Sequence, residues 1–96
     1  MRLTDIQIVE AIVANIAYGD DGFRREGKFR IRDRVVDGGD NLGVVVKCYV
    51  TINDYFGYLY RNPAYRVLFV DGKVRTRRSY DLRKAQGWEI RAEMRD

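Results

Sequence analysis

The chain has 96 residues, of which 46% are hydrophobic and 33% are charged, and it contains a single proline. This size fits one domain, and the composition is typical of a folded protein rather than a disordered one. Eighteen lysine and arginine residues against fourteen acidic residues give a net charge of +4. The sequence has no histidine, which excludes Ser-His and Cys-His catalytic arrangements and removes the commonest metal ligand.

The cysteine count and the distribution of apolar residues bear on the cellular setting. Cys48 is the single cysteine, so it cannot form an internal disulfide. The sequence has neither a charged-then-apolar leader nor an apolar run of about 18 residues. We therefore expect a soluble cytoplasmic protein with no membrane partner, and we expect Cys48 to pack in the core.

The N-terminal segment predicts an amphipathic helix from Asp5 to Tyr18. The stretch Thr4–Gln7 fits a capping box, and Gly19 stands where a helix would end. Apolar residues recur at three- and four-residue intervals, namely Ile6, Val9, Val13 and Ile16, with Ile8 and Ile12 beside them. We expect this stripe to cover a sheet, so that Val13→Asp would unfold the domain; a homodimer formed through the helix is the alternative.

A polar connector, residues 20–27, leads to a predicted hairpin with strands Lys28–Val36 and Gly43–Ile52. Alternation in the first strand places Phe29, Ile31 and Val35 on one side and Lys28, Arg30, Arg32 and Arg34 on the other. Asp33 falls on the apolar side, which indicates a bulge or an ion pair. The segment Asp37–Asn41 is typical of a turn, although its side chains Asp37, Asp40 and Asn41 could also hold a hard cation.

The segment Asn53–Ala64 has no clear period. It fits a short helix, or a loop that breaks at Asn62-Pro63, because a residue before proline avoids the helical region. Four aromatic residues are crowded into it: Tyr55, Phe56, Tyr58 and Tyr60. We expect them to cap the edge of the core, with a stacking platform for bases or an anchor for a partner as alternatives.

The C-terminal third predicts a second hairpin, with strands Tyr65–Val70 and Lys73–Arg78 around an Asp71-Gly72 turn. A short helix, Tyr80–Gln86, and a last strand, Trp88–Met94, would follow. Together these segments predict an α+β fold: one antiparallel sheet of four to five strands packed against the N-terminal helix, with a short second helix near the C-terminus. We expect a single compact domain over residues 1–96.

The predicted order of strand, turn, strand and short helix over Tyr65–Gln86 is similar in outline to the small three-stranded DNA-binding domains of phage integrases. It is also similar to several small phage-encoded inhibitors, including anti-CRISPR proteins. The resemblance implies a role in binding DNA or a protein that handles nucleic acid. It assigns no individual site residues.

The candidate site is an array of cations and one tyrosine on the open face of the predicted sheet. It comprises Arg30, Arg32, Arg34, Lys47, Tyr49, Lys73, Arg75 and Arg77. Such a face can hold nucleic acid through phosphate contacts and stacking. We therefore expect a non-enzymatic nucleic-acid-binding module without cofactor or metal; the alternative is an interaction or inhibitor module that acts on an acidic protein surface.

Overall fold

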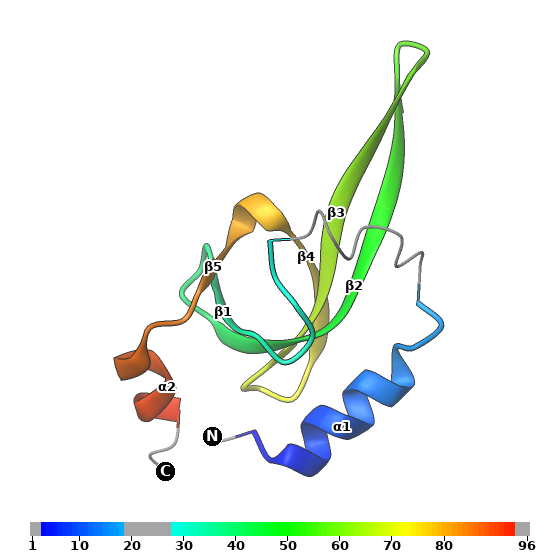
Figure 1. Cartoon of the computed structure of the whole chain (residues 1–96). Helices are drawn as coiled ribbons and strands as arrows, with labels where there is room; N and C mark the ends of the chain where they lie inside the picture. Colours follow the sequence, from blue (N-terminus) through cyan, green and yellow to red (C-terminus); the bar gives the residue numbers. More distant parts are fainter. Residues whose placement is uncertain (1–2, 19–27, 94–96) are drawn as a thin grey trace.

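The computed structural model describes residues 3–18 and 28–93, which form one antiparallel five-stranded sheet, an N-terminal helix and a short C-terminal helix (Figure 1). This confirms the predicted α+β class. The strand order is β4-β3-β2-β1-β5. The elements are α1 (Asp5–Ala14), β1 (Arg34–Asp37), β2 (Leu42–Tyr55), β3 (Tyr58–Phe69), β4 (Val74–Arg78), the 3-10 turn η1 (Ser79–Asp81), β5 (Leu82–Lys84) and α2 (Gly87–Glu93). No helix in the described ranges is long and apolar enough to cross a membrane.

The sheet is strongly curled, and its two faces contribute to two different cores (Figure 1). The curl brings the guanidinium group of Arg77 in β4 to the carboxylate of Asp37 in β1, although β3 and β2 lie between these strands in the sheet. The inner core consists of Phe29, Val35, Val45, Val50, Tyr65, Val67, Phe69 and Leu82. The outer core, between the sheet and α1, consists of Leu3, Ile8, Val44, Val46 and Leu68.

Helix α1 begins as predicted but turns a different face to the sheet. The capping box is confirmed: the Gln7 backbone N–H donates to the Thr4 hydroxyl, and the Thr4 N–H donates to the Gln7 side chain. The helix ends at Ala14 rather than Tyr18, and Gly19 lies outside the described residues. The stripe expected to be buried is exposed to between 43% and 71%: Ile6, Val9, Val13 and Ile16.

The prediction that Val13 is a core residue is therefore wrong, and the physical reason lies at the two ends of the helix. Leu3 is buried beside Ile8 in the outer core, just before the helix begins. Beyond its end, the Lys47 ammonium donates to the Ile16 carbonyl at 2.7 Å. Because the helix carries two apolar stripes, these anchors decide which stripe meets the sheet.

The first strand begins at Arg34 instead of Lys28. A turn interrupts the expected alternation: the Arg30 N–H donates to the Asp33 carboxylate at 2.9 Å, and Arg32 has a left-handed φ of 80°. Phe29 is buried as predicted, but Ile31 is 44% exposed. At Asp33 the described residues show a turn closed by this side-chain-to-backbone bond, and not the strand bulge or the ion pair that the sequence predicted.

The C-terminal prediction is wrong in both elements. Where a helix was expected over Tyr80–Gln86, the chain forms η1 and then β5, which pairs with β1 and buries Leu82 in the inner core. Where a strand was expected over Trp88–Met94, helix α2 forms; Met94 lies outside the described residues. Glu89 explains the helix, because its carboxylate accepts the Gln86 N–H and fixes the first turn.

Candidate partner-binding arm

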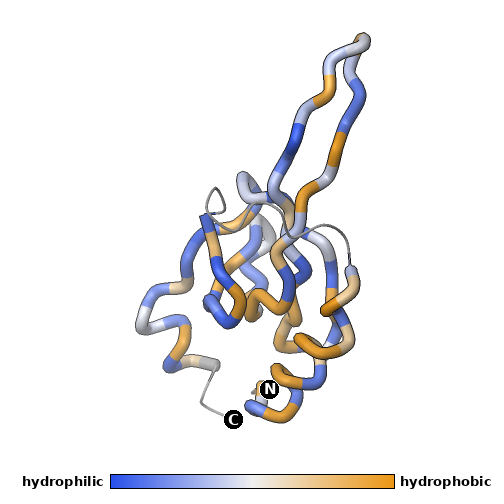
Figure 2. Tube along the Cα trace, turned by 45° about the vertical axis from the view of Figure 1, so that its right-hand side comes forward, coloured by the Kyte–Doolittle hydropathy of each residue, from blue (hydrophilic) through white to orange (hydrophobic). Residues whose placement is uncertain are grey.

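The segment without a clear period in the sequence forms a two-stranded arm that projects from the body (Figures 1 and 2). Strands β2 and β3 stay paired as far as Tyr55 and Tyr58, and the two-residue turn Phe56-Gly57 closes the tip. The molecule measures 50 × 25 × 22 Å, and the arm, residues 51–62, accounts for its long dimension. The expectation of a short helix or a loop over Asn53–Ala64 is therefore wrong.

Cross-strand register sorts the side chains of the arm into two faces, because directly paired residues lie on the same side and successive residues alternate. The pairs Thr51 with Asn62, Asn53 with Tyr60 and Tyr55 with Tyr58 share one face. We call this face, with those six residues, the tyrosine face. The opposite face carries Ile52, Asp54, Leu59 and Arg61.

Every large apolar side chain of the arm is at least half exposed. The exposed fractions are 64% for Ile52, 64% for Tyr55, 88% for Phe56, 69% for Tyr58, 73% for Leu59 and 51% for Tyr60. Figure 2 shows apolar positions continuing along the arm, away from both cores. The expectation that the four aromatic residues cap the core is wrong, because the arm carries them beyond it.

The tip turn has an aromatic residue in a conformation that favours asparagine or glycine. Phe56 and Gly57 have φ values of 51° and 83°, the positive values of a type I′ hairpin turn. A residue with a side chain other than Asn or Asp pays roughly 1 kcal/mol or more for this conformation. Phe56 is 88% exposed and so gains little burial in return, and its ring forms an edge-to-face pair with Tyr55 at 4.7 Å.

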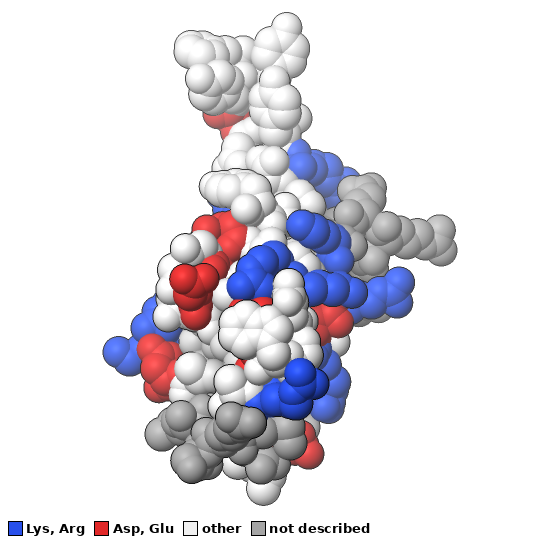
Figure 3. All heavy atoms as spheres, turned by 90° about the vertical axis from the view of Figure 1, so that its left-hand side faces the viewer, with Lys and Arg blue, Asp and Glu red and all other residues white. Residues whose placement is uncertain are grey.

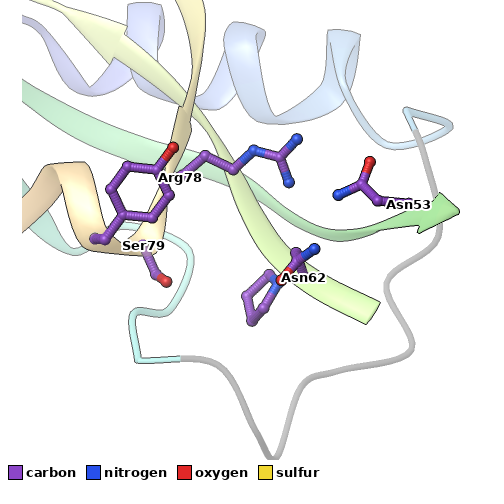
Figure 4. A pocket seen from close by; sticks show the side chains of 6 residues that line it. Asn53, Asn62, Arg78 and Ser79 are labelled. Carbon is purple, nitrogen blue, oxygen red and sulfur yellow. The ribbon is translucent and has the colours of Figure 1, made fainter. Parts of the chain in front are cut away.

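A hollow of about 290 Å³ lies at the base of the arm, where the tyrosine face meets the end of β4 (Figure 4). It is lined by Asn53, Asn62, Pro63, Arg78, Ser79 and Tyr80. The Arg78 guanidinium donates to the Thr51 hydroxyl, which holds the side chain against the arm. Neither the arm nor this hollow belongs to the site predicted from the sequence.

Two of the predicted site residues are buried instead of exposed. Lys47 is 8% exposed and Tyr49 is 6% exposed. The Lys47 ammonium donates to the Ile16 carbonyl, just beyond the end of α1. The Tyr49 ring packs edge-on against Tyr18, and its hydroxyl donates to Thr76 at 3.2 Å. The expectation that Lys47 and Tyr49 lie on an open face is wrong, because the segment that follows α1 covers both side chains, next to a register shift between Val45 and Lys47.

The alternation in β4 is confirmed, but two of its predicted site residues, Arg75 and Arg77, already have acidic partners. Arg75 pairs with Asp71 at 2.9 Å, and Arg77 pairs with Asp37 at 3.2 Å. The guanidinium groups of both arginines lie over the ring of Phe69. Lys73, at the turn before β4, is exposed.

Asp37 organises its turn and receives the Arg77 ion pair. Its carboxylate accepts the N–H groups of Gly39 and Asn41 at 3.0 and 2.9 Å. Burial alone would raise the pKa of this carboxyl, but hydrogen bonds from Asn41, Arg77 and Gly39 lower the pKa below its ordinary value. These bonds support the turn interpretation over the cation-binding one, and within the described ranges no group of three or more potential ligands could hold a metal ion.

The remaining three predicted cations do not form one strand face. Arg30 and Arg32 are exposed in the turn before β1, whereas Arg34 is half-buried within β1. On the face that Figure 3 shows, acidic groups lie among the lysine and arginine side chains of the body, while the projecting end is mostly uncharged. The eight residues therefore do not share the single open sheet face that the sequence predicted.

Comparison with protein-family models, with curated proteins and with solved structures finds no match for this chain. The candidate site therefore rests on the geometry of the arm and of the hollow at its base.

Proposed function

We propose that the chain is a non-enzymatic protein-interaction module that engages its partner through the arm. The observation that carries the proposal is the exposed apolar surface on both faces of the arm, together with Phe56 at its tip in a costly conformation. Exposed apolar patches of this kind mark interaction sites, and backbone strain at an exposed position is a reason to suspect function. The single cysteine fits the cytoplasmic setting that we propose for the module.

The four aromatic residues of the arm would supply half or more of the area of a standard protein interface. A fully buried aromatic side chain removes roughly 150–250 Å² from water, so the exposed fractions of the four aromatic residues would bury roughly 400–700 Å². A standard interface buries roughly 800 Å² on each partner. Tyrosine, with asparagine beside it, is also typical of binding surfaces that combine rigid rings with adaptable hydrogen bonds.

The charge of the arm favours a protein partner over nucleic acid. Its only charged residues are Asp54 and Arg61, so the arm has no net charge. Affinity for nucleic acid depends heavily on neutralising phosphates, which a neutral arm cannot do. The net charge of +4 and the exposed side chains of Arg30, Arg32 and Lys73 support nucleic acid as the competing hypothesis, and the experiment below separates the two.

Co-purification from the native host, with and without nuclease, tests the proposal. We compare the parent chain with Tyr58→Ser, which removes a ring from the tyrosine face, and with Val13→Ser. Val13 is 60% exposed on α1, so the second variant removes a similarly exposed apolar side chain far from the arm. We expect the parent and Val13→Ser to retain a protein partner after nuclease treatment, and Tyr58→Ser to lose it.

Capture that disappears with nuclease would overturn the proposal in favour of nucleic acid. Capture that is equal for parent and Tyr58→Ser would overturn the role of the arm. Light scattering of the purified chain measures its mass and identifies the case in which the partner is a second copy of the chain. In that case the parent should have the mass of a dimer, and Tyr58→Ser should have the mass of a monomer.

A further inference from the structure

The hollow at the base of the arm contains a cation that no carboxylate neutralises within the described part of the chain. Among the described residues, the side chain of Arg78 hydrogen-bonds to the Thr51 hydroxyl alone, and no described acidic side chain lies within ion-pair distance of it. The arginines at positions 75, 77 and 83, by contrast, each contact an acidic side chain. A guanidinium has five N–H donors, so the described residues leave most of those on Arg78 without an acceptor.

The groups around Arg78 are also suited to bind an anion. Asn53 and Asn62 come from the two strands of the arm, and Ser79 follows Arg78 where β4 ends (Figure 4). The side chains of these three residues make no hydrogen bond with another described residue, so no described group occupies their amide and hydroxyl donors. Pro63 and the 87% exposed ring of Tyr80 add apolar walls.

We infer that this hollow binds a carboxylate of the partner's docking segment, an inference that rests on the proposed function of the arm. A planar guanidinium fork matches a carboxylate through two parallel hydrogen bonds, and the neighbouring amides can donate to the same oxygens. One unpaired cation is balanced by one carboxylate, whereas a polynucleotide would require several unpaired cations along its path. The docking segment therefore presents an acidic residue next to the apolar residues that cover the tyrosine face.

The most direct test uses acetate as the probe. The full chain, labelled with ¹⁵N, is titrated with sodium acetate against sodium chloride at the same ionic strength, and the Nε–Hε signal of Arg78 and the side-chain amide signals of Asn53 and Asn62 are followed by NMR. We expect these signals to move in a saturable manner with acetate and not with chloride. The Arg75 Nε–Hε signal is the internal control and should stay still, since Asp71 already occupies that guanidinium.

Matched variants establish which cation binds acetate. Arg78→Gln should weaken acetate binding roughly tenfold or more, as expected for loss of charge-assisted hydrogen bonds. Arg78→Lys keeps the positive charge but loses the planar guanidinium, so it should bind acetate with an affinity between those of the parent and Arg78→Gln. If Arg78→Gln does not fold, Arg78→Lys should still fold and takes its place in the comparison. Arg30→Gln removes an exposed cation elsewhere and should bind acetate as the parent does.

Three outcomes would overturn the inference: no saturable shift in the parent, equal binding by Arg78→Gln, or inorganic phosphate that binds at least as tightly as acetate. The titration uses no protein partner, so it is independent of the capture experiment. If acetate does not bind but Tyr58→Ser still loses the partner, only the carboxylate site fails. If acetate binds but capture does not depend on Tyr58, the proposed role of the arm fails.

Discussion

Phe56→Asn should make the protein more stable and, if the arm is the binding element, less able to bind. The variant converts the tip to Asn-Gly, the sequence that a type I′ turn prefers. Relief of the left-handed strain at position 56 contributes roughly 1 kcal/mol. Loss of the exposed edge contact between Tyr55 and Phe56 removes roughly 0.5 kcal/mol. Because Phe56 is 88% exposed, little burial is lost, and the free energy of unfolding should rise by about 0.5 kcal/mol.

Thermal unfolding measures this change, which corresponds to a rise in Tm of roughly 2–4 °C for a domain of this size. Gly57→Ala is the matched control: a Cβ at that position meets no atom within 4 Å, so its cost comes from the φ of 83° alone. It should lower the free energy of unfolding by roughly 1 kcal/mol while keeping the aromatic tip. A Phe56→Asn protein that melts below the parent would refute the turn argument, and one that captures the partner as well as the parent would refute a binding role for Phe56.

Three further predictions concern the body of the domain. Ile8→Asp should abolish folding, whereas Val13→Asp should shift stability by less than about 0.5 kcal/mol in chemical denaturation, because only Ile8 is buried. Asp37→Asn should cost about 2 kcal/mol in the same assay, since the charge that pairs with Arg77 is lost; equal stability of variant and parent would contradict this. Arg83 and the Gln86 N–H lower the pKa of Glu89 from 4.5 to about 2, so its stabilising contribution is full above about pH 4.5 and is lost as the pH falls towards 2. Fluorescence of the lone tryptophan, which lies in α2, should follow this loss, and Glu89→Gln should remove that pH dependence.

The features that the sequence could predict are those determined by neighbouring residues. The capping box at Thr4 and the alternation in Lys73–Arg78 each depend on chemistry within a few positions, and each is confirmed. The second hairpin also forms, but its turn runs from Phe69 to Gly72, because the Gly72 N–H donates to the Phe69 carbonyl, and it is not the two-residue Asp71-Gly72 turn that the sequence predicted. The α+β class follows from the same local patterns. The burial of Phe29 was predicted from its own strand pattern, although the strand itself begins later.

The features that the sequence could not predict depend on contacts between distant residues. The face of α1 that meets the sheet is set by Leu3 and by the bond from Lys47, neither of which appears in the periodicity of the helix. The closer charge partner of Arg77 is Asp37, which precedes it by 40 residues, so the alternation placed the Arg77 side chain correctly but could not show that it forms an ion pair. For the arm, the Phe-Gly turn is a weak hairpin indication, since a phenylalanine is uncommon at that position.

Exposed aromatic side chains are concentrated on the arm of this small domain. In the body, Arg75, Arg77 and Arg83 are held by acidic partners while Arg30, Arg32 and Lys73 are exposed, so the net charge of +4 does not by itself define a basic binding surface. Along the arm and at its base, apolar rings are exposed and the guanidinium of Arg78 lacks an acidic partner among the described residues. Because these groups contribute little to either core, their exposure is a cost that folding alone does not explain, and a partner that covers the rings and neutralises the cation would offset it.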